Sequence, residues 1–118
     1  MDAATQMRTR LRSDLLVAMR ERRTGEVALI RELIAAIDNA EAPTVQIDSD
    51  LPSYVRHEFS RGSAEVERLV LSSAQVHALF LREIERRERA ATRFEGLGDL
   101  TRARALRSEA LMARRYVE

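Results

Sequence analysis

The stretch EVALIRELIAAIDNAE, residues 26–41, decides the fold of this chain of 118 residues. Its apolar side chains recur every three or four residues and, at about 100° per residue, cover about half of a helix. A surface helix needs a narrower apolar stripe, so we predict that residues 26–41 form the central helix of a small bundle. Burial of one Leu or Ile contributes about 1.5–3 kcal/mol, so this helix should hold most of the core.

A first helix is predicted over residues 5–23, where an apolar stripe recurs at helical spacing: Met7, Leu11, Leu15 and Ala18. Thr24 and Gly25 then interrupt the pattern. We expect Gly25 to end this helix, and Thr24 or Gly25 to cap the next.

Two more helices are predicted to form an antiparallel hairpin at the C-terminus. Ser72-x-x-Gln75 is the sequence of a capping box, and Leu71 with Val76 forms the matching hydrophobic staple, so a helix should run to about residue 95. Gly96-Leu97-Gly98 ends it, and Asp99 caps a helix over 100–116. The predicted inner face of that last helix consists of Leu100, Ala103, Leu106, Ala110 and Leu111. The short loop makes the two helices antiparallel.

The fold class is therefore all-α, a small helical bundle in a single domain over residues 1–118. A variable acidic connector interrupts it at about 42–70, where Pro43, Pro52 and Gly62 break the helical pattern. Residues 25–66 carry three Arg against eight Asp and Glu, a net charge of −5. Four Gly and two Pro leave few turns for a many-stranded β fold.

The composition excludes several functional classes. With no Cys, the chain has no disulfide, thiol nucleophile or Cys-ligated metal site. The two His, His57 and His77, lack metal-ligand spacing, so we expect no metal, no cofactor and no catalytic residues. The longest apolar runs have five residues, whereas a membrane span needs about 20. We expect a cytoplasmic protein without a membrane anchor.

One helix face carries a candidate nucleic-acid site. Arg82, Arg86, Arg89 and Arg93 have the spacing i, i+4, i+7 and i+11 and fall within about 60° of one another on the helical wheel. Guanidinium groups bind phosphates bidentately, so this row could grip an RNA backbone. The alternative is a solvated face with the ion pairs Glu83–Arg87 and Glu85–Arg89. Arg occupies all 20 of the Lys and Arg positions, so its abundance is a property of the whole chain and says little about function. The evidence for a nucleic-acid site is that four of these residues lie on one helix face.

Four segments, in their order and spacing, resemble the N-terminal helical half of YqeY-like proteins. They are LRSDLLVAMR at 11–20, LIRELIAAIDNAE at 29–41, Leu71-Ser72 with Glu83-Ile84-x-x-Arg87, and Gly98-Asp99-Leu100 with RSEAL at 107–111. The sequence RRTG at 22–25 departs from the family, where an acidic residue is often found, and longer members continue into a second, smaller subdomain.

This resemblance implies a helical bundle of the GatB/YqeY type and an accessory module that binds tRNA or an amidotransferase-type assembly. Any carbon–nitrogen ligase activity with glutamine as amido donor is implied by the resemblance alone, and the chain has no Cys for glutamine hydrolysis. We therefore expect a module that is non-catalytic by itself. The alternative is a protein-interaction or homo-oligomeric scaffold, favoured if Leu16, Leu81 and the cluster Tyr54-Val55-Phe59 are exposed. The sequence leaves the oligomeric state open.

Overall fold

The computed structural model describes residues 1–43 and 68–118. In these two ranges the chain forms helices and no strands, which confirms the all-α prediction. The helices are α1 (Ala3–Arg20), α2 (Thr24–Glu41), α4 (Ser73–Gly96) and α5 (Leu100–Arg114). The connector predicted at about 42–70 falls mostly outside the described residues, as do His57 and the cluster Tyr54-Val55-Phe59.

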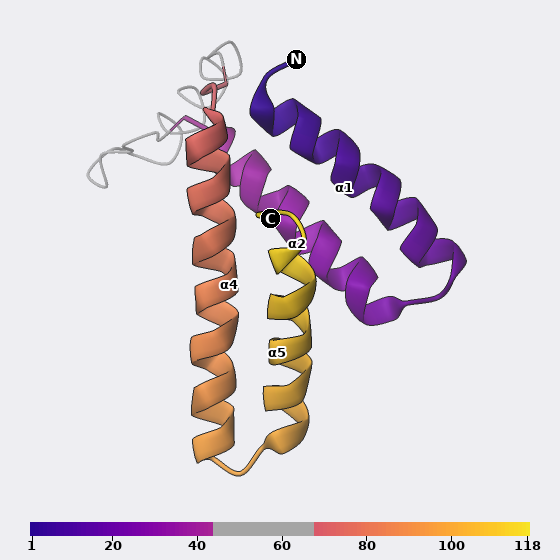
Figure 1. Cartoon of the computed structure of the whole chain (residues 1–118), viewed down its shortest axis with the longest axis vertical. Coiled ribbons are helices and arrows are strands. Elements are labelled where there is room, and N and C mark those ends of the chain that lie inside the picture. Colours follow the sequence, from indigo (N-terminus) through magenta and orange to yellow (C-terminus); the bar gives the residue numbers. More distant parts are fainter. Residues whose placement is uncertain (44–67) are drawn as a thin grey trace, which may run out of the picture.

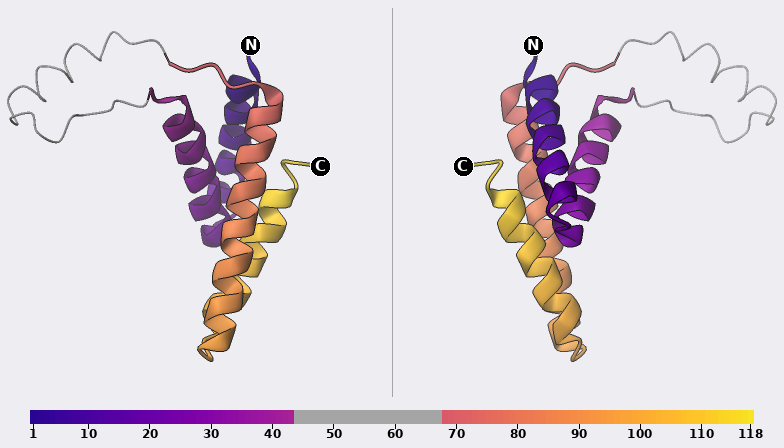
Figure 2. Two further views of the ribbon diagram at one scale, coloured as in Figure 1. Left: turned by 90° about the vertical axis from the view of Figure 1, so that its left-hand side faces the viewer. Right: turned by 90° about the vertical axis from the view of Figure 1, so that its right-hand side faces the viewer.

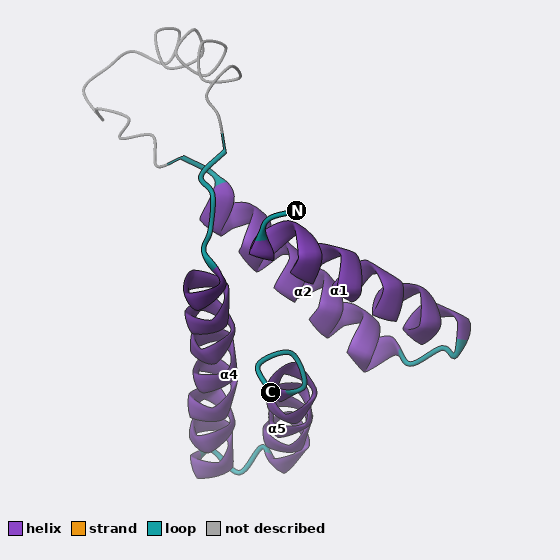
Figure 3. Ribbon diagram, turned by 45° about the horizontal axis from the view of Figure 1, so that its top comes forward, coloured by secondary structure: helices purple, strands orange, loops and turns teal. Residues whose placement is uncertain are grey.

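The helices pair as two antiparallel hairpins that cross each other. Figure 1 shows α1 beside α2 and α4 beside α5, with α2 passing behind the upper part of the second pair, and Figure 3 shows that the first pair runs obliquely to the second. The lower parts of α4 and α5 extend beyond the α1–α2 hairpin and cover only each other (Figure 2). The predicted C-terminal hairpin is thus confirmed.

Helix α2 is central, as its wide apolar surface predicts. It packs against α1, α4 and α5. Leu29, Ile30, Leu33 and Ile37 are at most 1% exposed, and they meet Leu11 of α1 in the core. Phe80 of α4 is also fully buried there. The core is therefore largely aliphatic, in agreement with the low aromatic content.

The predicted inner face of α5 is partly wrong. Leu100 and Leu111 are 53% and 67% exposed, whereas the buried residues of this helix are the alanines Ala103, Ala110 and Ala113. At 100° per residue, the two leucines lie about 100° away from the alanine stripe, so one face cannot bury both sets. Small side chains on the buried stripe let α5 approach α4 closely.

Predicted caps define the starts of α4 and α5. The Ser72 hydroxyl accepts a hydrogen bond from the Gln75 backbone N–H at 3.1 Å, and the Ser72 N–H donates to the Gln75 side chain at 2.8 Å. Leu71 and Val76 are both buried, as a hydrophobic staple requires. The Asp99 carboxylate likewise accepts from the Arg102 N–H at 3.1 Å. Both predicted starts are confirmed.

The end of α1 differs from the prediction. The helix stops at Arg20, and Gly25 lies inside the first turn of α2, so it neither ends α1 nor caps α2. Instead, Arg22 takes a left-handed conformation with φ of 57°. The Arg22 and Arg23 N–H groups donate back to the carbonyls of Met19 and Ala18 at 3.2 and 2.9 Å. This pattern is a Schellman motif, and it can end a helix without Gly when another residue accepts positive φ.

A second Schellman motif ends α4 and offers a direct comparison. There Gly98 takes the left-handed conformation with φ of 80°, and the Asp99 N–H donates to the Phe94 carbonyl at 2.9 Å. Glycine adopts this conformation without the steric cost that a Cβ imposes. The two motifs therefore share their hydrogen bonds and differ in the residue at the strained position.

This difference predicts opposite effects of two substitutions. Arg22→Gly should raise the free energy of unfolding by up to about 1 kcal/mol, because it removes the left-handed strain. Gly98→Ala should lower the free energy of unfolding by about 1 kcal/mol, although a Cβ there would meet no other atom within 4 Å. Urea denaturation followed by circular dichroism measures both changes. Equal effects of the two substitutions would contradict the assignment of strain to Arg22.

Candidate functional site

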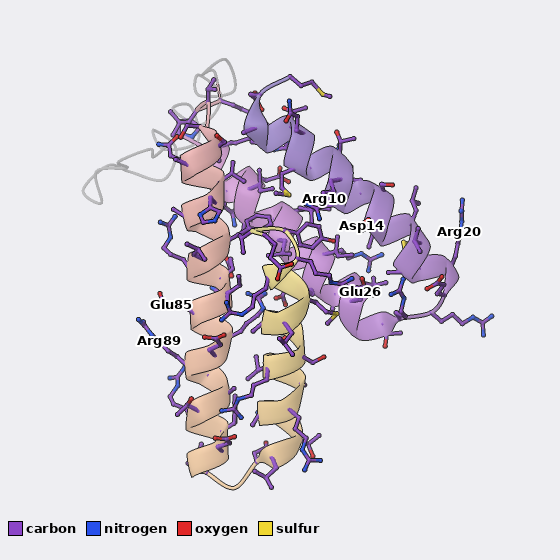
Figure 4. All side chains as sticks on the ribbon, in the orientation of Figure 1. Arg10, Asp14, Arg20, Glu26, Glu85 and Arg89 are labelled. Atoms are coloured by element: carbon purple, nitrogen blue, oxygen red, sulfur yellow. The ribbon has the colours of Figure 1, made fainter. Side chains whose placement is uncertain are left out.

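The four predicted arginines lie together on the outer face of α4. Arg82, Arg86, Arg89 and Arg93 are all exposed, and with Glu85 they line one shallow hollow along the helix. Figure 4 shows Arg89 and Glu85 pointing away from the other three helices. We call the four arginines the arginine face.

Ion pairs engage part of the arginine face. Glu85 pairs with Arg89 at 3.6 Å, and Glu83 pairs with Arg86 at 2.9 Å. Arg82 and Arg93, at the two ends, have no ion pair with any described residue. In the Glu85–Arg89 pair both side chains are exposed, at 62% and 77%, and such pairs contribute only about 0–1 kcal/mol. Glu83 is only 14% exposed and also pairs with the buried Arg87, so it is held more firmly. A phosphate could therefore displace the Glu85 carboxylate from Arg89 at small cost.

One arginine of α4 is buried and is linked to the arginine face through Glu83. Arg87 is only 4% exposed, and its guanidinium donates to Glu83 of α4 at 2.8 Å and to Glu32 of α2. The predicted pair Glu83–Arg87 is thus confirmed, but inside the protein rather than on a solvated face. The Glu83 carboxylate pairs with both Arg86 and Arg87, so it joins the arginine face to the interior.

Helix α5 also contributes a carboxylate, that of Glu109, to the surroundings of the buried Arg87. The Glu109 carboxylate lies 3.9 Å from Arg87 Nε, which makes no hydrogen bond within the described residues. Burial raises the pKa of the Glu109 carboxyl above its ordinary value of 4.5, Arg87 opposes this shift, and Glu32 adds to it. Burial and the second carboxylate thus outweigh the attraction of a guanidinium at this distance.

Two further buried polar groups tie α1 to the rest of the bundle. Arg8 is 9% exposed and binds Asp38 at 3.0 Å and Glu41 near the end of α2. Tyr116 lies edge-on to Phe80, with ring centroids 6.1 Å apart, and its hydroxyl donates to Asp14 at 2.6 Å. Burial and this hydrogen bond raise the pKa of Tyr116 well above its ordinary value.

The burial of Arg8 and Arg87 is not among the predictions from the sequence, although their positions contain a signal. Arg87 follows Phe80 and Ile84 at i+7 and i+3 and therefore belongs to the apolar stripe of α4. Arg8 lies in the same way between Ala4 and Leu11 on α1. A charged residue on a core stripe predicts a buried ion pair.

The described residues show no alternative site of the kinds considered. In ranges 1–43 and 68–118, no group of three or more His, Cys, Asp and Glu side chains could hold a metal ion. His77 is exposed near the start of α4. None of the described helices combines the length and apolar character needed to cross a membrane. The arginine face is therefore the candidate that the geometry supports.

Comparison with known proteins gives no relative for this site. No family model, no curated protein and no solved structure matches the chain.

The Glu109 environment predicts a pH-dependent effect of Glu109→Gln. Because the folded-state pKa exceeds the unfolded-state pKa, folding favours the protonated carboxyl. That contribution to stability is complete below the unfolded-state pKa and is lost as the pH rises through the folded-state pKa. Glu109→Gln should therefore be more stable than the wild type at pH 7, and the gain should disappear near pH 3.5, below the ordinary carboxyl pKa of 4.5.

The matched control is Glu95→Gln. A hydrogen bond from Arg107 lowers the pKa of the exposed Glu95 carboxyl, so the same substitution there should reduce stability at pH 7 rather than increase it. Urea titrations at pH 7 and pH 3.5 measure the sign of the change in the free energy of unfolding for each variant. A loss of stability for Glu109→Gln at pH 7 would mean that attraction to Arg87 dominates.

Proposed function

We propose that this chain is a non-catalytic accessory module that binds the phosphate backbone of RNA through the arginine face of α4. The observation that carries the proposal is the alignment of Arg82, Arg86, Arg89 and Arg93, all exposed, on one side of one helix. With 1.5 Å rise per residue, the row spans about 16 Å. Guanidiniums at these intervals suit a line of phosphates better than a single anion.

The same face favours the backbone over the bases. Sequence is read from base edges or by stacking of unpaired bases on aromatic rings. The hollow along α4 is lined by arginines and Glu85, with no aromatic residue. Phe94 of α4 is half-buried, and the Arg102 guanidinium lies over its ring at 5.2 Å. We therefore expect binding with little sequence preference.

The identity of the RNA comes from the family resemblance. The motifs at 11–20, 29–41 and 71–87 are similar to those of YqeY-like proteins, which share a domain with the tRNA-contacting tail of an amidotransferase subunit. We therefore propose tRNA as the ligand, bound by the chain alone or within an amidotransferase-type assembly. The phosphate-binding part of the proposal rests on the arginine face, independently of that resemblance.

Salt dependence of tRNA binding tests the proposal. Each phosphate contact contributes about −0.7 to −0.9 to the slope of log Kobs against log salt concentration, so four arginines predict a slope of about −2.8 to −3.6. Arg86→Glu and Arg89→Glu should each weaken binding. The double variant Arg82→Gln with Arg93→Gln should make the slope shallower by about 1.4–1.8. Fluorescence anisotropy with labelled tRNA measures affinity over a salt series.

Arg20→Glu is the charge-matched control. Arg20 is exposed at the end of α1, far from Arg89 (Figure 4). If binding follows the arginine face, this variant keeps both the affinity and the slope of the wild type. Equal weakening by Arg20→Glu and Arg89→Glu would show that only net charge matters, and absence of binding at low salt would refute the proposal.

The second candidate function is a homo-oligomeric scaffold without nucleic-acid binding. Leu16 of α1 and Leu81 of α4 are 56% and 42% exposed, as that alternative requires. Self-association should then appear in light scattering as a mass that rises with protein concentration, and Leu81→Glu should abolish the rise. A strict monomer at micromolar concentration would exclude this candidate.

A further inference from the structure

A shallow hollow at the closed end of the α1–α2 hairpin is separate from the arginine face. Met19, Val27 and Ala28 supply its apolar surface, and Arg22, Thr24 and Arg31 complete the lining. We call it the hairpin hollow. Figure 1 places the α1–α2 turn at the opposite side of the molecule from the outer face of α4. The hairpin hollow is thus outside the surface used by the proposed RNA site.

The apolar side chains at this hollow are left uncovered by the fold. Met19 is 47% exposed, and Leu16, one turn earlier on α1, is 56% exposed. Ala28 and Arg31 lie on the surface of α2 that faces away from the core. Adjacent exposed apolar residues bounded by charged ones are typical of a docking surface.

The charged side chains that line the hollow are both cationic. Every acidic residue of the described hairpin accepts a hydrogen bond or forms an ion pair: Asp2, Asp14, Glu21, Glu26, Glu32, Asp38 and Glu41. Four exposed arginine side chains of the same hairpin have neither an ion pair nor a hydrogen bond with a described residue: Arg12, Arg20, Arg22 and Arg31. Arg10 also lacks an ion pair, but its guanidinium donates to the Arg115 carbonyl at 3.1 Å. Two of these four, Arg22 and Arg31, line the hollow itself. The surface is therefore apolar at its floor and cationic at its rim.

We propose that the hairpin hollow docks an acidic amphipathic helix of a partner protein. Such a helix can place apolar residues at i, i+3 and i+4 into a groove between two helices while its carboxylates meet the rim. Arg22 and Arg31 would pair with those carboxylates. This combination disfavours RNA, because phosphates gain nothing from Met19 and Val27. A bilayer is also a poor fit, because a flat surface does not fill a hollow. The inference goes beyond the proposed RNA binding and does not depend on it.

Synthetic peptides of about four helical turns test the proposal. The probe is built from Ala, Glu and Leu, with Leu at i, i+4, i+7 and i+11 so that it has one apolar stripe. One control replaces every Glu with Lys, and another spreads the same Leu residues around the helix. Titration of the full-length, isotope-labelled chain, followed by nuclear magnetic resonance, reports both the affinity and the residues perturbed.

We expect the acidic striped peptide to perturb Met19, Val27 and Arg31 and to bind at least about tenfold more tightly than either control. Met19→Glu and Arg31→Glu should each weaken binding by a similar factor. Arg104→Glu, an exposed charge reversal on α5, is the matched control and should bind as the wild type does.

Several results would overturn the proposal. These are no perturbation at about 1 mM peptide, perturbation centred elsewhere, or equal binding of the peptide with scattered Leu. If Met19→Glu binds tRNA as tightly as the wild type does but loses the peptide-induced perturbation, the proposal is supported and the two surfaces act independently. Folding of each variant is checked by circular dichroism, and Met19→Leu, which keeps the apolar floor, should retain binding.

Discussion

The buried guanidinium of Arg87 is the interaction on which the placement of three helices depends. It reaches carboxylates of α2, α4 and α5 through Glu32, Glu83 and Glu109. Removing a partner that is hydrogen-bonded to a buried charge costs about 3–5 kcal/mol, because the remaining charge stays desolvated. Apolar burial draws the helices together without fixing their rotation, whereas the hydrogen bonds from Arg87 to Glu83 and Glu32 fix how α4 faces α2. The Glu109 carboxylate of α5 adds an ion pair at 3.9 Å without a hydrogen bond.

The rotation of α4 in turn determines what its outer surface carries. With Arg87 directed inward beside Phe80 and Ile84, the residues about 140° away on the helix must point to solvent, and these are the four arginines of the outer face. Glu83 connects the arginine face to the buried Arg87, because its carboxylate pairs with both Arg86 and Arg87. The inward position of Arg87 thus determines that the four side chains of the arginine face point to solvent.

Periodicity and capping made most of the fold predictable. The apolar surface of residues 26–41 and the Ser72–Gln75 box are local signals, and the structure retains both. Longer-range packing was less predictable. Leu111 was expected inside because leucine is apolar, but the alanine stripe of α5 determines which side of that helix α4 can approach. For the candidate site, helical spacing predicts the row of exposed arginines, whereas the charge of Arg8 and Arg87 does not reveal that they are buried.

The turn after α1 links backbone strain to surface chemistry. Arg22 adopts a left-handed conformation that glycine tolerates better, and the same residue supplies a cation at the rim of the hairpin hollow. Thermal stability and surface charge therefore make opposite demands on one position. Under selection for stability alone, this codon should drift toward glycine. If close relatives retain arginine at position 22, this residue serves a function other than the stability of the fold.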